Sequence, residues 1–245
     1  MLSVFESGMG VSPLSLPTSF DLAPLALVSG RAAGGEERAS TVLYLSGLTI
    51  RRKNLTFPTR LFVSSSILRK DFKMARAGAI TFKGTSMTLL GPELNVGSQA
   101  PDFKIHFFEG GLKTITLADL KGKPTFISVV PSLDTGTCQI QTKKFNVELG
   151  GMGDKINALT VSRDLPFAMN RFCGAEDIKA MKVGSDYQDG NFGTSFGLMI
   201  DELKLLARAV YVLDATGKVV YKEIVPEVAA EPNYEPAVAA LKALL

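Results

Sequence analysis

One cysteine lies where a predicted strand passes through a short loop into a predicted helix. The segment reads VVPSLDTGTC and ends at Cys138, which we place in the first turn of the helix. Free N–H groups and the positive end of the helix dipole favour a thiolate over a thiol at that position. Because the thiolate is the nucleophilic form of cysteine, the pattern indicates a reactive sulfur at residue 138.

Three residues of the preceding loop could shape the surroundings of that sulfur. Thr135 can point its hydroxyl into the same small space, and Pro131 can shield that space from bulk water. Asp134 carries a carboxylate that would oppose ionisation of the thiol. We therefore expect Asp134 to point toward solvent.

A charged residue inside an otherwise apolar run indicates the same place. Arg208 interrupts the run 205–212, and an arginine in such a run is almost never buried without a partner. A thiolate at the end of a neighbouring strand would supply the counter-charge, and the guanidinium could also hold an oxygen of a substrate. Alternatively, Arg208 lies at a sheet edge and pairs with a surface carboxylate. The sequence pattern favours neither arrangement.

The second cysteine, Cys173, follows Cys138 by 35 residues, so the two form no C-x-x-C redox pair and no recognisable metal site. Unpaired cysteines are among the most buried residues, and the residue type alone favours inert packing for Cys173. Its position at the end of a short predicted helix, beside Gly174, nonetheless indicates a segment that could unwind. Unwinding would bring its sulfur to Cys138.

The elements around these residues alternate between strand and helix patterns, which predicts a βαβ unit with parallel strands. The predicted elements are a hairpin at 79–90 turning at 84–86, strands at 125–130 and 156–162 around a helix at 138–149, a helix at 165–172 opened by Asp164 and Pro166 and closed by Gly174, a hairpin of strands at 205–213 and 219–225, and a helix at 234–245. This order predicts an α/β chain with a thioredoxin-like fold. A central mixed sheet is flanked by helices and preceded by an N-terminal β-hairpin.

Residues 1–73 differ from the rest of the chain in composition and pattern. The chain carries 27 Lys and Arg against 24 Asp and Glu, and residues 1–73 hold nine of the basic and five of the acidic residues. Residues 74–245 are therefore nearly neutral, with 18 basic and 19 acidic residues. We expect residues 1–73 to be a poorly ordered extension or a product of start-site choice, with Met74 as the true start. Residues 74–245 then form the folded domain.

Composition excludes several classes of protein. The 245 residues include one histidine, His106, which excludes zinc sites built on paired histidines, and two cysteines are too few for a disulfide scaffold. No apolar run approaches the roughly 20 residues that cross a bilayer. Residues 74–245 hold no basic cluster of the kind that binds nucleic acid. We therefore expect no membrane or nucleic-acid partner, and no cofactor or metal.

Taken together, these residues resemble the thiol peroxidases of the atypical two-cysteine peroxiredoxin group. The resemblance covers roughly residues 74–245 and does not extend to residues 1–73. It rests on four segments that follow one another in the family's order: PSLDTGTC at 131–138, DLPFA at 164–168 with RFCGAE at 171–176, LARAV at 206–210, and EPNYE at 231–235. The combination is highly specific, although each segment alone is a weak signal.

The resemblance implies a role for each candidate residue. Cys138 corresponds to the peroxidatic cysteine, whose thiolate attacks a hydroperoxide and becomes sulfenic acid. Cys173 corresponds to the resolving cysteine, which then forms an intrachain disulfide with Cys138. Thr135 and Arg208 correspond to groups that hydrogen-bond the peroxide and stabilise charge in the transition state, and Pro131 to the shield of the pocket.

The same resemblance implies thioredoxin as the reductant, a homodimer and a cytoplasmic enzyme. A genuine targeting role for residues 1–73 would instead favour an organelle. Because the two cysteines start on separate predicted helices, disulfide formation requires local unfolding around one or both. Bridged Cα atoms must approach within about 7 Å.

Two other functions fit parts of the pattern. A general thiol–disulfide exchanger should carry C-x-x-C where this chain has TGTC at 135–138. A binding or structural module of thioredoxin-like fold with two inert cysteines leaves the set of Pro131, Thr135, Cys138 and Arg208 unexplained. Turnover by a Cys138→Ser variant distinguishes these functions from a peroxidase.

Overall fold

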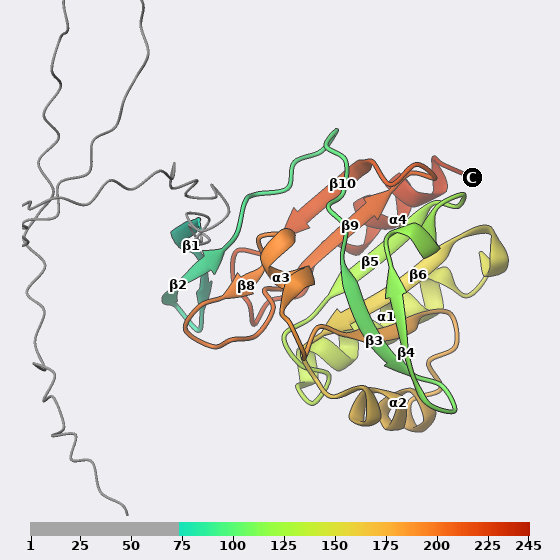
Figure 1. The fold of residues 1–245 in the computed structure, drawn as a ribbon, viewed down its shortest axis with the longest axis horizontal. Helices are drawn as coiled ribbons and strands as arrows, with labels where there is room; N and C mark the ends of the chain where they lie inside the picture. The colour runs from blue at the N-terminus through green and yellow to red at the C-terminus, as the bar shows by residue number, and fades with distance from the viewer. Residues whose placement is uncertain (1–73) are drawn as a thin grey trace, which may run out of the picture. The chain divides into compact units, whose positions relative to one another are not determined.

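The computed structural model describes residues 74–245, so the predictions made for residues 1–73 lie outside the described part of the chain. The strands form two sheets (Figure 1). The larger has seven strands in the order β10-β9-β5-β6-β7-β3-β4, and the smaller has three in the order β1-β2-β8. The large mixed sheet and its helices confirm the predicted fold class.

The elements have the following bounds. The strands are β1 Ala75–Phe82, β2 Thr85–Leu90, β3 Lys104–Phe108, β4 Leu112–Thr116, β5 Thr125–Val129, β6 Asn157–Ser162, β7 Lys182–Ser185, β8 Met199–Ile200, β9 Ala209–Leu213 and β10 Val219–Ile224. The helices are α1 Gly136–Leu149, α2 Pro166–Ala175, α3 Asn191–Ser195 and α4 Tyr234–Lys242, with 3₁₀ turns at Ala118–Leu120 and Gly153–Lys155.

Alternation along the central strands sends side chains into two separate cores. In β9, Val210 and Val212 pack in the core that α1, α2 and α4 share, whereas Tyr211 packs in the core with α3 and the small sheet. Arg208 continues the alternation of Val210 and Val212. The period of two therefore directs its side chain toward α1.

The predicted βαβ unit and both hairpins are confirmed, with shifted ends. β5 pairs with β6 in parallel through α1, and all five residues of β5 are buried. β1 pairs with β2 and β9 with β10 in antiparallel fashion. Helix α1 begins at Gly136 rather than Cys138, the first hairpin turns at Lys83 and Gly84, and α4 ends at Lys242.

The predicted strand at 205–213 is wrong in its first half. Only residues 209–213 form β9, because the backbone before them bonds to the region of β8. Ala207 N donates to Leu198 O at 2.7 Å, and Ile200 N donates to Leu205 O at 2.8 Å. Arg208 therefore lies just before β9, where the chain enters the main sheet.

The predicted ends of the second helix are also partly wrong. Helix α2 does begin at Pro166, but it continues through Gly174 to Ala175. The residue before the helix, Leu165, makes no side-chain cap, and Asp164 does not cap the helix either. The carboxylate of Asp164 accepts hydrogen bonds from other segments instead, so tertiary donors have displaced the local capping interaction.

A carboxylate ties the first hairpin to the loop before α4. Glu227 accepts hydrogen bonds from Ala229 N at 3.0 Å, Lys83 N at 2.9 Å and Thr81 Oγ1 at 2.8 Å. These bonds lower the pKa of Glu227 from 4.5 to about 2. The next residue, Val228, donates its N–H to Thr81 O at 2.8 Å. The hairpin thus fixes the backbone at residues 227–229.

This attachment predicts a specific acid sensitivity. The folded-state pKa of Glu227 is depressed, so its contribution to stability is complete above about pH 4.5 and is lost as the pH falls toward about 2. We expect Glu227→Gln to be less stable than the wild type at pH 7 and to lose part of the stability difference between pH 4.5 and 2. Thermal unfolding across that pH range measures both effects. Equal pH slopes for the two proteins would contradict the assignment.

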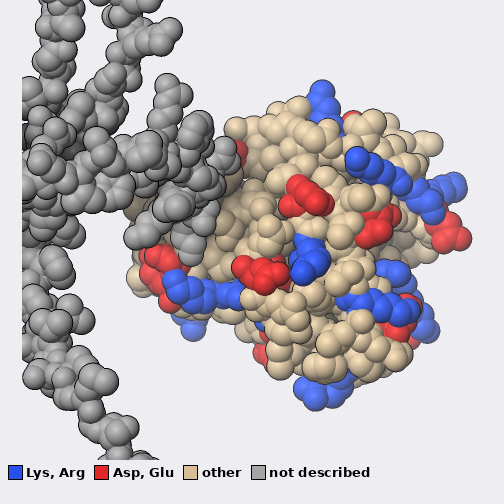
Figure 2. Space-filling view, in the orientation of Figure 1, with Lys and Arg blue, Asp and Glu red and all other residues tan. Residues whose placement is uncertain are grey.

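The surface of the described domain carries mixed charge. On the face seen in Figure 2, basic and acidic side chains are interspersed, and this face of residues 74–245 presents no continuous basic strip. Among the described residues, no helix combines the length and the apolar character that a membrane crossing requires.

Candidate active site

Cys138 lies in the first turn of α1 and is completely buried. The preceding strand, β5, is buried throughout and ends at Val129, and the loop at 130–135 leads from its end to the helix. The sulfur therefore lies where the chain leaves a parallel strand and enters a helix N-terminus. Free N–H groups at this point of a helix favour negative charge.

Arg208 donates a hydrogen bond to the sulfur of Cys138. Its side chain is 2% exposed, and its Nη2 donates to Cys138 Sγ at 3.3 Å. Its Nη1 donates to Gln141 Oε1 at 2.6 Å and its Nε to Val228 O at 2.9 Å. Of these three acceptors, only the sulfur can ionise. The structure thus places the guanidinium against the thiol, the first of the two arrangements considered above.

Gln141 is a member of the site that the sequence analysis did not find. It is completely buried one turn after Cys138, and its Nε2 donates to Ser128 Oγ at 2.8 Å. With both ends of its amide bonded, Gln141 holds the Arg208 guanidinium in a single orientation. The spacing of three residues from the cysteine puts both side chains on one helix face, and this was the signal available in the sequence.

The loop residues occupy the rim of the site. Thr135 is exposed at the N-terminus of α1, and its Oγ1 donates to Ser132 O at 2.9 Å. A threonine hydroxyl that donates in this way keeps its lone pairs free to accept a hydrogen bond from a ligand. Pro131 is buried at the end of the strand, and Asp134 is exposed, as expected. The structure therefore places Pro131 and Thr135 at opposite ends of one short loop.

Cys173 lies on α2 and forms no disulfide with Cys138 in this structure. It is half-buried against the core that contains Cys138. Burial raises the pKa of the Cys173 thiol to about 11. Near neutral pH this sulfur is therefore a thiol, and it is a poor nucleophile while α2 is folded.

We expect Cys173 in the folded protein to react slowly with an alkylating reagent. With a pKa of about 11, its thiolate fraction at pH 8 is about 100-fold below that of an ordinary cysteine. Timed iodoacetamide labelling followed by peptide mass spectrometry measures the rate, and the urea-unfolded chain is the control. Labelling of native Cys173 at the rate seen in the unfolded chain would show that burial does not suppress its ionisation.

Comparisons with known proteins show the family of the chain. The family model described as Redoxin matches residues 95–238. A thiol peroxidase of Bacillus subtilis (strain 168) is 52% identical over 166 residues, which cover 68% of this chain and 98% of that protein. A thiol peroxidase of Staphylococcus aureus (strain MRSA252) is 48% identical over 163 residues, 66% of this chain and 97% of that protein.

A solved structure adds agreement in three dimensions. The crystal structure of a peroxiredoxin-like protein from Aquifex aeolicus is 39% identical, has a TM-score of 0.64, and matches 69% of this chain and 98% of that one. This chain belongs to the redoxin family, in which it is a peroxiredoxin-type oxidoreductase. Within that class it is similar to the thiol peroxidases, which supports a peroxidase activity.

Proposed function

We propose that the chain reduces hydroperoxides through a sulfenic acid at Cys138 and an intrachain disulfide with Cys173. The observation that carries this proposal is the 3.3 Å contact between Arg208 Nη2 and Cys138 Sγ at the N-terminus of α1. A buried guanidinium and a helix N-terminus both stabilise negative charge on that sulfur. In this setting the Cys138 sulfur can act as the nucleophile in its thiolate form.

In the first step, the Cys138 thiolate attacks the terminal oxygen of the hydroperoxide. A sulfur–oxygen bond forms, the oxygen–oxygen bond breaks, and water or an alcohol leaves with the proton. Thr135 Oγ1 accepts a hydrogen bond from the peroxide, and Arg208 stabilises the charge that moves onto the leaving oxygen. Pro131 keeps bulk water from the sulfur.

In the second step, Cys173 attacks the sulfenic acid. A disulfide forms and water leaves. The two sulfurs belong to different helices, and Cys173 has its pKa raised by burial, so α2 must open locally before the reaction. Opening removes the burial that suppresses ionisation, and it gives Cys173 access to Cys138. A reductant of the thioredoxin type then returns both cysteines to thiols, and the working unit is a homodimer.

Coupled turnover tests this function. The chain, thioredoxin, thioredoxin reductase and NADPH are mixed with hydrogen peroxide or cumene hydroperoxide, and NADPH loss is followed by absorbance. We expect turnover with thioredoxin, and a Cys173→Ser variant should carry out one oxidation of Cys138 without further thioredoxin-coupled turnover. Equal turnover by that variant would exclude Cys173 from the cycle.

A further inference from the structure

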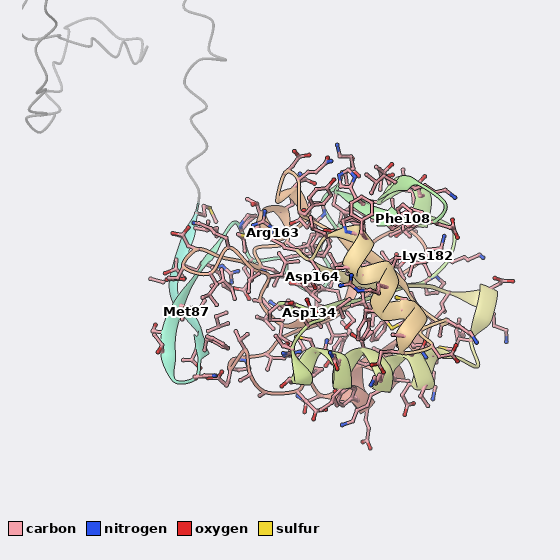
Figure 3. All side chains as sticks on the ribbon, turned by 90° about the horizontal axis from the view of Figure 1, so that it is seen from below. Met87, Phe108, Asp134, Arg163, Asp164 and Lys182 are labelled. Carbon is pink, nitrogen blue, oxygen red and sulfur yellow. The ribbon has the colours of Figure 1, made fainter. Side chains whose placement is uncertain are left out.

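Asp164 connects the loop in front of Cys138 to the start of α2. Its Oδ1 accepts a hydrogen bond from Ser132 Oγ at 2.7 Å, and its Oδ2 accepts one from Leu133 N at 2.7 Å. In Figure 3 the labelled Asp164 lies beside the segment that carries Asp134. The loop thus depends on a carboxylate that lies some 30 residues further along the chain.

The Ser132 carbonyl connects this anchor to Thr135. Ser132 O accepts hydrogen bonds from Thr135 N at 3.2 Å and from Thr135 Oγ1 at 2.9 Å. The orientation of the threonine hydroxyl is therefore set by the peptide group that Asp164 holds. Without that anchor, the loop would regain backbone freedom, and the Thr135 hydroxyl would lose its fixed orientation.

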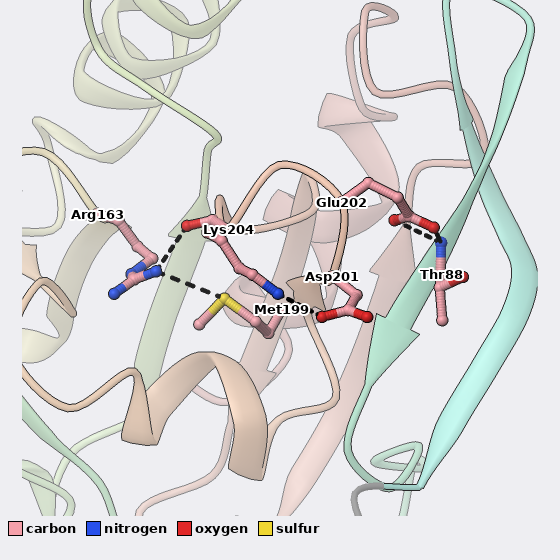
Figure 4. A network of polar contacts seen from close by, with 6 residues as sticks. All are labelled: Thr88, Arg163, Met199, Asp201, Glu202 and Lys204. Carbon is pink, nitrogen blue, oxygen red and sulfur yellow. Dashed lines mark hydrogen bonds and ion pairs between the residues drawn. The ribbon is translucent and has the colours of Figure 1, made fainter. Parts of the chain in front are cut away.

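The anchor itself is held from two sides. Ser162 Oγ donates to Asp164 Oδ2 at 2.8 Å, and Ser185 Oγ donates to the Asp164 carbonyl. The neighbouring Arg163 bonds in another direction: its Nη1 donates to Lys204 O at 2.6 Å and lies 3.8 Å from Met199 Sδ (Figure 4). The carboxylate is thus presented to the loop from a segment with little freedom to move.

We propose that Asp164 is a positioning residue for the attack on peroxide, acting through Ser132 on the Thr135 hydroxyl. The inference rests on the proposed function, because it assigns Thr135 to peroxide binding. The carboxylate of Asp164 accepts its hydrogen bonds from Ser132, Leu133 and Ser162, and none of these donors belongs to Cys138. Its effect is on the orientation of the peroxide, so it should change the rate with peroxide and not the general reactivity of Cys138.

Two serines provide a matched pair of variants. Ser132 and Ser162 each donate a hydroxyl hydrogen bond to the Asp164 carboxylate, and each accepts one from a backbone N–H two residues later. Only Ser132 belongs to the loop. Ser132→Ala and Ser162→Ala therefore each remove one hydroxyl donor from the same carboxylate, and only Ser132→Ala removes a contact to the loop. The bond from Leu133 N to Asp164 remains in both variants.

The test compares two reagents on the full chain. Hydrogen peroxide must be oriented by the Thr135 hydroxyl before it reacts with Cys138, whereas iodoacetamide needs no such contact. Loss of free Cys138 thiol is timed for both by quenching and peptide mass spectrometry. We expect Asp164→Ala, which removes both contacts to the loop, to slow the peroxide reaction by about 10- to 100-fold. Ser132→Ala removes one of those contacts and should slow it by less, Ser162→Ala should slow it less again, and all iodoacetamide rates should stay near the wild type. The serine pair keeps the test decisive if Asp164→Ala does not fold.

The outcomes separate this inference from the proposed function. If wild-type Cys138 does not react with hydrogen peroxide, the proposed function fails and the positioning role fails with it. If the wild type reacts and Ser132→Ala reacts equally fast, only the positioning role is wrong. Equal slowing of peroxide and iodoacetamide, or equal slowing by the two serine variants, would show a general structural effect and overturn the inference.

Discussion

Cys138→Ser should lose its peroxidase turnover, by at least about 1,000-fold. A serine hydroxyl stays protonated at neutral pH even beside a guanidinium and a helix N-terminus, and it forms no sulfenic acid. The structure leaves room for the substitution, because the side chains differ by one atom and the donor contact from Arg208 can pass to the oxygen. Hydroperoxide consumption coupled to thioredoxin measures the loss.

Cys173→Ser is the matched control for this variant. It makes the same atomic change in the other cysteine and should keep the single oxidation of Cys138. Full turnover by Cys138→Ser would contradict the account. Such a result would leave the contact between the arginine and the cysteine as a packing feature of a protein with another function.

Replacement of Arg208 is expected to have the next largest effect. Arg208→Met should slow oxidation of Cys138 by about 100- to 1,000-fold, because it removes the charge beside the sulfur and a donor to the leaving oxygen. It also leaves Gln141 Oε1 and Val228 O without their partner, at a cost of about 1–3 kcal/mol for each buried group. Arg208→Lys should recover little of the rate, since one ammonium cannot reach three separate acceptors.

The measurement is the initial rate of Cys138 oxidation, read by quenched alkylation, together with the free energy of unfolding in urea. Arg76→Met is the control, because it removes a largely buried guanidinium from β1, where Arg76 pairs with Glu93 at 3.5 Å. That variant should lose stability and keep the oxidation rate. If the two variants lose stability equally and also oxidise equally fast, the charge of Arg208 does not assist the reaction.

Local patterns were sufficient to predict the elements that carry the candidate site. The βαβ unit follows from two apolar runs around one helix, and the position of Cys138 near the helix start follows from their spacing. The apolar run 205–212 predicted Arg208 inside a buried strand, whereas it lies just before β9, and the sequence could not choose its partner. That choice depends on which face of the sheet α1 covers, a fact of topology.

The errors have a common cause, which is competition from distant groups. Asp164 has the residue type and position of a helix cap, but the serine hydroxyls and the Leu133 N–H outcompete the helix for its oxygens. Residues 205–207 have the composition of a strand, but their backbone bonds to the region of β8. Sequence periodicity contains no information on such partners.

Short elements were missed for a different reason. β8 has two residues, and β7 has four, one of which is Gly184. A Cβ at Gly184 would lie 2.4 Å from Ile105 Cδ1, so the glycine allows β3 to approach closely. A four-residue strand that includes a glycine has too few apolar side chains to show the alternation that predicts a strand.

In the proposed reaction, one hydroperoxide molecule converts the two thiols into a bond between Cys138 and Cys173. The most direct measurement is peptide mapping of the wild-type chain after one equivalent of hydrogen peroxide, with free thiols blocked by alkylation. We expect a linked peptide pair containing both cysteines, and an intact mass lower by two hydrogens. A Cys138 carrying two or three oxygens beside an alkylated Cys173 would contradict it.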